Sequence, residues 1–158
     1  GHGGARIENA GFLYPDGSPA ATIHGGDECV LWIRARAERS LTGPIVGFML
    51  RNATGQNVFG NNTFLPTLDA DRTAREGETL TAYFRFQMPY LPAADYFLAP
   101  SIIEGTQQDH IHLHWMEEAL TVRVVASPVN RSAVGVPMID VGLELEQPEP
   151  RSDARVGG

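Results

Sequence analysis

Three histidines alternate with apolar residues in the stretch DHIHLHW, residues 109–115. Because successive side chains on a β-strand point to opposite faces, this spacing predicts that the imidazoles share one face and that Ile111, Leu113 and Trp115 share the other. Imidazoles gathered in this way can ligate a metal ion, contact a polar ligand, or form the solvated side of a sheet. The elements around the stretch decide between these kinds of face.

A metal site is the sharpest of these interpretations. His112, His114 and Glu118 form the pattern H-x-H-x3-E, which resembles part of the first motif of the cupins, a family of metal-binding jelly rolls. That resemblance implies, as an alternative function, a metal-dependent cupin-like enzyme that uses these three residues. Two departures count against it. No histidine follows His114, and Gly105 precedes His112 by seven residues, one away from the cupin spacing. We therefore expect no metal and no cofactor.

Nucleophilic catalysis has even less support in the sequence. The single cysteine, Cys29, lies in the apolar run CVLWI, which is typical of a buried thiol, and it has no second cysteine for an internal disulfide. The sequence contains no G-x-S-x-G, P-loop or G-x-G-x-x-G motif. Carboxylates are frequent, but nothing singles out a glycosidase pair. We predict that the domain is not an enzyme.

The composition is that of an ordinary globular domain with an acidic balance. A chain of 158 residues is long enough for one domain with its own core. The formal net charge of −7 argues against nucleic acid as a partner. The sequence has no run of 18 apolar residues, so it predicts no transmembrane helix, and the first residues lack the apolar stretch of a signal peptide.

Short alternating segments separated by turn residues dominate the chain, whereas helix signals are poor. Two apolar runs around the turn NATGQ predict a hairpin within residues 43–60. The polar stretch 68–78 is expected to form a loop. The further expected strands are DECVLWIRARA (27–37), TLTAYFRFQM (79–88), ADYFLAPSIIEG (94–105), DHIHLHW (109–115), EALTVRVVA (118–126) and VPMIDVGLEL (136–145). This organisation predicts an all-β fold, an antiparallel β-sandwich of the immunoglobulin-like or jelly-roll type.

The parity of apolar residues predicts which strand faces point into the core. One core face carries Leu80, Ala82, Phe84, Phe86 and Met88, and another carries Cys29, Leu31, Ile33 and Ala35. The opposite faces mix aromatic rings with hydrogen-bonding side chains. Such a mixture suits a sugar, because a pyranose offers C–H groups to a ring and hydroxyls to polar groups. The predicted carbohydrate-binding residues are Trp32, Arg34, Tyr83, Arg85, Gln87, His112 and His114. The alternative is that they are unrelated outward positions on different sheets.

One segment carries the most specific resemblance to a known family. VGFMLRNATGQNVFGNNT, residues 46–63, resembles the C-terminal carbohydrate-binding domain of Wzt, the nucleotide-binding subunit of ABC exporters for O-antigen polysaccharides. That family shows a Val-Gly-Phe strand, a turn with Gly, and then Gly-x-Asn-Thr, which Gly60, Asn62 and Thr63 match here. Gly77-Glu78 before an alternating strand matches as well. LPAADYFL departs from the family pattern, because Ala94 stands where a glycine is expected. The resemblance covers residues 10–146.

The resemblance implies a non-catalytic module that recognises lipid-linked O-antigen polysaccharide and couples it to export. Its partners would be the ATPase and transmembrane parts of the exporter, with the ATPase domain outside this sequence, and its location would be cytoplasmic. The resemblance also implies a homodimer in which the last strand, residues 134–145, is exchanged between protomers. We expect that strand, with its near-continuous apolar character, to be buried on both faces.

The expected domain organisation follows from these segments. Residues 1–4, GHGG, resemble a remnant of cloning, and residues 5–146 form the carbohydrate-binding sandwich. Residues 147–158 are polar and rich in Pro and Gly, so we expect a disordered tail.

Overall fold

The computed structural model describes residues 3–64, 72–105, 110–125 and 138–148, and within these ranges the regular structure consists of β-strands. The strands are β1 (Ala5–Leu13), β2 (Thr22–His24), β3 (Glu28–Ala37), β4 (Leu41–Thr42), β5 (Pro44–Arg51), β6 (Asn57–Asn62), β7 (Thr73–Ala74), β8 (Thr79–Gln87), β9 (Ala94–Gly105), β10 (His110–Trp115), β11 (Leu120–Val125) and β12 (Met138–Glu146). The described residues contain no helix that is long and apolar enough to cross a membrane.

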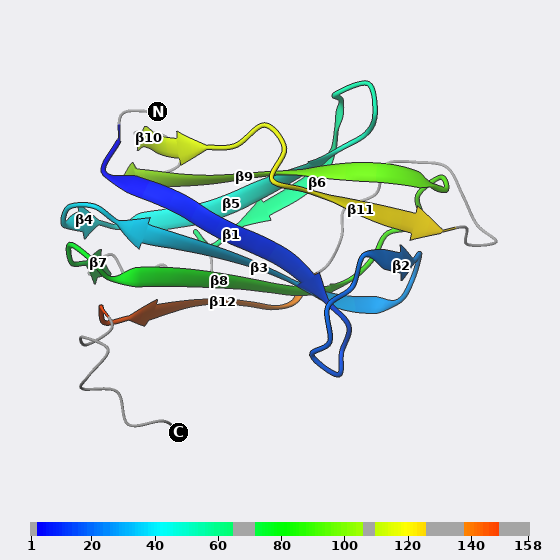
Figure 1. Ribbon diagram of the computed structural model, residues 1–158, viewed down its shortest axis with the longest axis horizontal. Coiled ribbons are helices and arrows are strands. Elements are labelled where there is room, and N and C mark those ends of the chain that lie inside the picture. The colour runs from blue at the N-terminus through cyan, green and yellow to red at the C-terminus, as the bar shows by residue number, and fades with distance from the viewer. Residues whose placement is uncertain (1–2, 65–71, 106–109, 126–137, 149–158) are drawn as a thin grey trace.

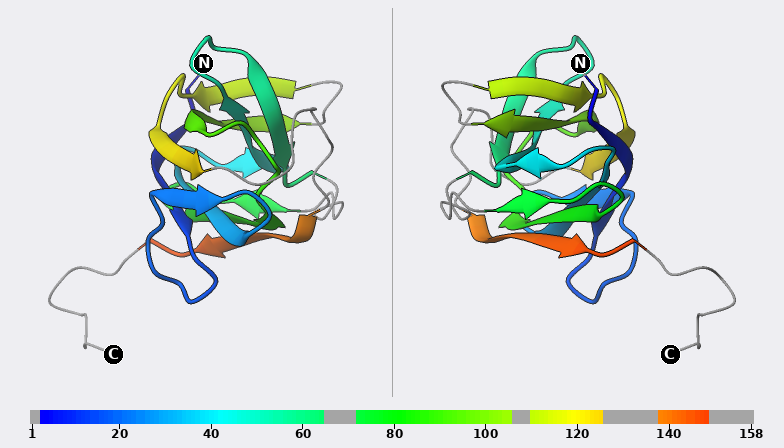
Figure 2. Two further views of the ribbon diagram at one scale, coloured as in Figure 1. Left: turned by 90° about the vertical axis from the view of Figure 1, so that its right-hand side faces the viewer. Right: turned by 90° about the vertical axis from the view of Figure 1, so that its left-hand side faces the viewer.

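The strands form two main sheets that pack into a sandwich (Figures 1 and 2). Sheet A has the order β1-β3-β8-β12, and sheet B has the order β2-β11-β9-β5-β6. The long strand β9 pairs with β5 along one edge, and with β11 and then β10 along the other. Strands β4 and β7 form a small separate pair. All these pairings are antiparallel except that of β2 with β11, so the predicted antiparallel sandwich is confirmed.

The core lies between the sheets and follows the predicted parity. All the core residues predicted on β3, β8 and the residue after β8 are buried, including Phe84 and Phe86. Phe48 of β5 meets the Phe84 ring edge-on, with the ring centroids 5.0 Å apart. Phe59 of β6 meets Phe86 in the same way at 5.7 Å. These rings join the two sheets directly beneath β5 and β6, which gives the outer face of sheet B a rigid support.

The N-terminal part of the chain contains strands that the sequence patterns did not indicate. Strand β1 forms an edge of sheet A, and the amide of Gly3, just before it, donates to the Leu113 carbonyl of β10 in sheet B over 3.1 Å. Arg39, which follows β3, forms an ion pair with Glu104 of β9 at 2.9 Å. Such contacts between distant segments leave no periodic signal in the sequence, and they tie the two sheets together at one end.

In the single chain the last strand has one face toward the core and one exposed, whereas burial of both faces was expected for a strand exchanged in the homodimer. Strand β12 pairs with β8 of the same chain. Leu143 is buried, whereas Ile139 and Asp140 are exposed. The apolar character reflects one face turned to the core and an edge position, since β12 ends the order of sheet A. Residues 134–137 of the predicted strand lie outside the described residues, as do 149–158 of the predicted tail and 1–2 of the predicted remnant.

The stretch DHIHLHW also departs from simple alternation. The pairing of β10 with β9 shifts register, so that His112 lies opposite Ile103 and His114 opposite Ile102. Neighbouring residues of β9 point to opposite faces, so these two histidines do so too. Leu113 is buried, as expected, but Trp115 is 49% exposed. The prediction that the histidines share one face and Trp115 the other is therefore wrong, because a bulge interrupts the strand.

Candidate functional site

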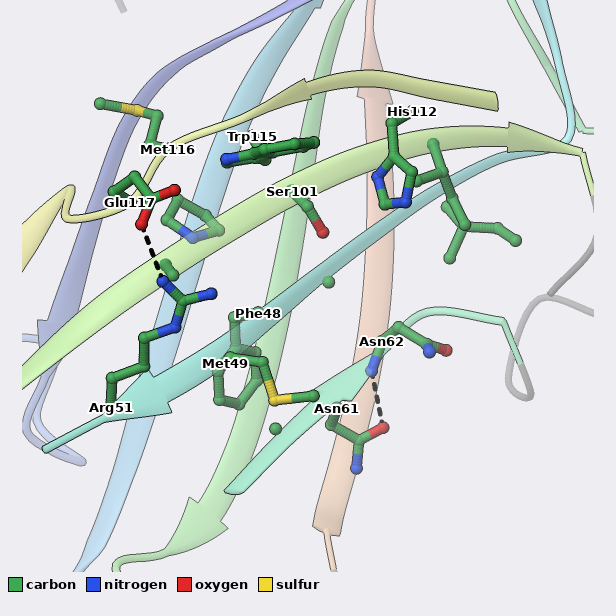
Figure 3. A pocket seen from close by; sticks show the side chains of 16 residues that line it. Phe48, Met49, Arg51, Asn61, Asn62, Ser101, His112, Trp115, Met116 and Glu117 are labelled. Carbon is green, nitrogen blue, oxygen red and sulfur yellow. Dashed lines mark hydrogen bonds and ion pairs between the residues drawn. The ribbon is translucent and has the colours of Figure 1, made fainter. Parts of the chain in front are cut away.

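A groove of about 510 Å³ lies on the outer face of sheet B, across β6, β5, β9 and β10 (Figure 3). Its floor consists mostly of small residues, with the longer side chain of Met49 among them. Gly47 of β5 pairs with Ser101 of β9, and on the next outward row Met49 lies between Gly60 and Ala99. Because most residues on this floor are small, the taller side chains on both sides form walls. A groove of this volume is within the range of small-molecule sites.

One wall carries the aromatic groups. Trp115 lies opposite Ser101, and His112 lies opposite Ile103 one row further along the strand. The imidazole meets the indole edge-on, with the ring centroids 5.6 Å apart and the planes at 84°. The bulge between them places both on the outer face. The indole is half exposed and held in orientation by its neighbour, so it can serve as a stacking surface.

The other wall carries neutral polar groups from β6. Asn61 and Asn62 line the groove, and in Figure 3 their side chains lie across from His112 and Trp115. The Asn61 Oδ1 accepts a hydrogen bond from the Asn62 backbone amide at 2.8 Å, and the Asn62 Oδ1 accepts one from the Phe64 backbone amide at 2.9 Å. These bonds orient both side chains and leave their NH2 groups to donate to a ligand.

An ion pair closes one end of the groove. The Arg51 Nη1 of β5 lies 3.1 Å from the Glu117 Oε2, beyond β10. The Arg51 Nε also donates to the Asn57 Oδ1 of β6 over 3.0 Å. The guanidinium therefore links three segments at the rim, and the pair carries no net charge.

The predicted residues of sheet A lie on the opposite side of the sandwich. One row crosses all four strands of that sheet, with Gly11, Trp32, Tyr83 and Gly142 as successive partners. The Trp32 ring lies over Gly11, so close that a Cβ on that glycine would be 2.9 Å from the indole nitrogen. The Arg34 guanidinium lies 5.2 Å from the centre of the same ring. The indole is therefore already partly covered by its own sheet.

The other predicted groups of sheet A also have partners. Arg85 donates to both carboxylate oxygens of Glu28, at 2.9 and 3.3 Å, and this bond is the main cause that raises the pKa of Arg85. Burial, followed by the Glu144 carboxylate, raises the pKa of Tyr83. Gln87 is exposed and lies opposite Glu28. Trp32, Arg34, Tyr83, Arg85 and Gln87 thus lie together on one face, and the two histidines lie on the other sheet.

His112 and His114 have different environments. His112 lines the groove, whereas the Nδ1 of His114 accepts a hydrogen bond from the Ile7 amide of β1 at 2.9 Å. That bond requires the imidazole proton on Nε2 and joins the edges of the two sheets. The described residues contain no group of three His, Cys, Asp or Glu side chains that could hold a metal ion. The cupin-like set of His112, His114 and Glu118 is not assembled, because the bulge separates the two imidazoles.

Sequence reasoning missed most of the groove. Trp115 was assigned to the apolar side of its strand, and Arg51 and Glu117 are 66 residues apart. Two sequence signals do fall in the groove: the predicted site residue His112, and the segment containing Gly47, Gly60 and Asn62, which was singled out for its turn and family pattern.

The fold and the groove define a β-sandwich domain with an open, mainly apolar site on the outer face of one sheet. Comparison with known proteins assigns it further: the family model described as the Wzt C-terminal domain matches residues 1–137, and the chain belongs to this family. No curated protein matches the chain.

A solved structure supports the same assignment at the level of fold. The crystal structure of the C-terminal domain of Wzt superposes with a TM-score of 0.71 at 20% sequence identity, over 80% of this chain and 77% of that one. At this identity the match shows the fold alone.

Proposed function

We propose that this domain binds an O-antigen polysaccharide without converting it, and that the glycan lies in the groove on sheet B. The observation that carries the proposal is the half-exposed Trp115 ring facing a wall of amide groups across a floor of mostly small residues. A sugar ring can stack on the indole while its hydroxyls bond to Asn61, Asn62 and Ser101. Membership of the Wzt C-terminal domain family supports this class of ligand.

Within the exporter, the domain would act as a recognition element. We infer that it is the C-terminal part of a nucleotide-binding subunit on the cytoplasmic side of the membrane. Its partners there are the ATPase and transmembrane parts of the ABC transporter. Binding of the lipid-linked glycan would then select the chain for export, and no chemical step would occur in the domain itself. A polymer with repeated units can also bind through avidity.

The face on sheet A is the rival surface for the same function. Trp32 and Tyr83 lie side by side there, with Arg34, Arg85 and Gln87 around them. A sugar could stack on these rings after Arg34 moves away from the indole. We favour the groove because its aromatic ring is exposed and its polar groups need no ion pair to break.

The proposed homodimer uses the last strand. Strand β12 ends the order of sheet A and contacts its own chain mainly through β8. The same pairing with β8 of a partner would exchange the strand without changing any bond of the sheet. Sedimentation equilibrium of the domain with and without residues 134–158 tests this: a dimer that becomes a monomer supports exchange, and a monomer in both cases contradicts it.

The test of the ligand and of its surface is one NMR titration. O-polysaccharide released from lipid A of the strain that encodes this chain is added to the domain, and the two indole N–H signals are followed. We expect the Trp115 signal to shift and to saturate while that of Trp32, assigned with Trp32→Phe, stays in place. Movement of Trp32 alone would transfer the proposal to sheet A. A folded domain that shows no shifts at millimolar repeat units would refute glycan binding for that polymer.

A further inference from the structure

The groove on sheet B carries few ionisable groups. Among the residues that line it, the ionisable groups are Arg51, His112 and Glu117. Arg51 is paired with Glu117 at 3.1 Å and also donates to Asn57. The strongest positive charge at the groove is therefore already matched by a carboxylate of the same chain.

The other groups that reach the groove are neutral. Asn61, Asn62 and Ser101 offer amide and hydroxyl groups, which can donate to or accept from sugar hydroxyls. Ile45, Met49 and Met116 add apolar surface. Hydroxyl and C–H groups find partners here, whereas a carboxylate or phosphate would lose solvation without gaining a free cation at the Arg51 end.

From this arrangement we infer that the groove takes an uncharged stretch of glycan, built of neutral pyranoses, and selects against acidic sugars. The inference rests on the proposed glycan-binding function and adds the chemical class of its ligand. An acidic sugar beside Arg51 would bring a second negative charge next to Glu117. The formal net charge of −7 adds repulsion at longer range. Glu117 is 78% exposed, so its pair with Arg51 is weak by itself, and the bond from Arg51 to Asn57 also holds the guanidinium at the rim.

Salt dependence of binding is the first test, because salt screens an attraction between charges and leaves stacking and neutral hydrogen bonds almost unchanged. Affinity for the O-polysaccharide released from lipid A of the encoding strain is measured by calorimetry at low and high sodium chloride. We expect Kd to change by less than about twofold between roughly 50 and 500 mM. A loss of about tenfold or more at the higher concentration would overturn the inference while leaving glycan binding intact. A lack of binding at both concentrations would instead remove the proposed function.

Two substitutions distinguish a neutral from an acidic ligand, because Glu117→Gln is expected to change the affinity in opposite directions for the two. If the bound glycan is neutral, Glu117→Gln weakens binding by about two- to fivefold, because Arg51 loses the partner that holds it at the rim. If the bound glycan is acidic, Glu117→Gln frees Arg51 and strengthens binding, and Arg51→Gln abolishes it. Near-equal, modest losses for the two variants support the inference, and a gain for Glu117→Gln contradicts it. Circular dichroism confirms that both variants are folded.

Discussion

The two outer faces of the sandwich use similar residues and form different surfaces. On sheet B, a row runs from Asn62 through Gly47 and Ser101 to Trp115. On sheet A, the corresponding kind of row runs from Gly11 through Trp32 and Tyr83 to Gly142. Each row thus combines glycine with aromatic side chains, and the groove of about 510 Å³ lies over the first row.

The position of the aromatic ring relative to the glycine explains the difference. Trp32 stands directly beside Gly11 and folds over it, so the space that the glycine leaves is filled by the same sheet. Trp115 is separated from Gly47 by Ser101, and it contacts His112 instead. On sheet A the space above the glycine is therefore filled by an aromatic ring, whereas on sheet B the aromatic ring stays clear of Gly47.

Substitution of the glycines should reveal the largest difference between the two faces. A Cβ at Gly60 would collide with the Phe48 carbonyl oxygen and lie 2.7 Å from the Met49 sulfur. Because the obstacle is partly backbone, we expect Gly60→Ala to lower the free energy of unfolding by about 2 to 3 kcal/mol, as measured by urea denaturation. The matched control is Gly142→Ala on sheet A, where a Cβ would meet nothing within 4 Å. Equal losses in both variants would contradict this explanation of the groove floor.

Removal of each indole should separate the two faces by function. We expect Trp115→Ala to weaken binding of the O-polysaccharide by about tenfold, because stacking on the exposed ring is lost. Trp32→Ala should leave the affinity within about twofold, but lower the stability by about 1 kcal/mol or more, because its ring covers Gly11 and packs with Arg34. Isothermal titration and urea unfolding measure the two effects. The reverse pattern of affinities would assign the glycan to sheet A.

The link between the two sheets through His114 gives a smaller effect. His114→Ala removes the acceptor for the Ile7 amide and should loosen β1 from β10. We expect a loss of about 1 kcal/mol and faster hydrogen exchange at the Ile7 amide, with little change in the core amides of β8. His112→Ala is the control, because that imidazole lines the groove and should change glycan affinity more than exchange at Ile7. Unchanged protection of Ile7 in His114→Ala would argue against this link.

The ion pair between Arg39 and Glu104 should produce the mildest effect, visible in acid. The hydrogen bond from Arg39 is the main cause that lowers the pKa of Glu104 below its ordinary value. Burial opposes this effect, and the hydrogen bond from the Thr42 amide adds to it. A carboxyl with a lowered pKa in the folded state contributes stability above the ordinary carboxyl pKa, and the contribution is lost as the pH falls through the folded value. We expect Glu104→Gln to be less stable than the parent chain at neutral pH and closer to it in acid. Thermal unfolding across the acid range measures this, and a constant difference at every pH would contradict it.

The sequence predicted the core and most of the strands. Parity alone identified the buried faces of β3 and β8, because the alternation of a half-buried strand is a local property and no bulge interrupts the pairing of these two strands. The hairpin of β5 and β6 followed from its turn residues for the same reason. Strands β1 and β2 and the short strands β4 and β7 were missed, since a short or edge strand with mixed residues is defined by its partner rather than by its own pattern.

The candidate site was a different matter. Parity correctly grouped Trp32, Arg34, Tyr83, Arg85 and Gln87 on one face, but it could not show that Arg85 pairs with Glu28 or that Trp32 covers Gly11. It placed Trp115 on the wrong side, because one bulge in β10 inverts the alternation. A bulge depends on how two strands meet, and DHIHLHW contains no residue that specifies it.

The sequence by itself therefore determined the β-sandwich, the inward faces of its main strands and the family pattern between Val46 and Thr63. Only the tertiary structure decided where a ligand can lie. The groove needs Arg51, Asn62, Ser101 and Trp115 on adjacent strands, and it needs an indole that no neighbour covers. The burial of a strand face follows from the local periodicity of the sequence. An open surface depends instead on which side chains from distant segments become neighbours and which of them cover the others.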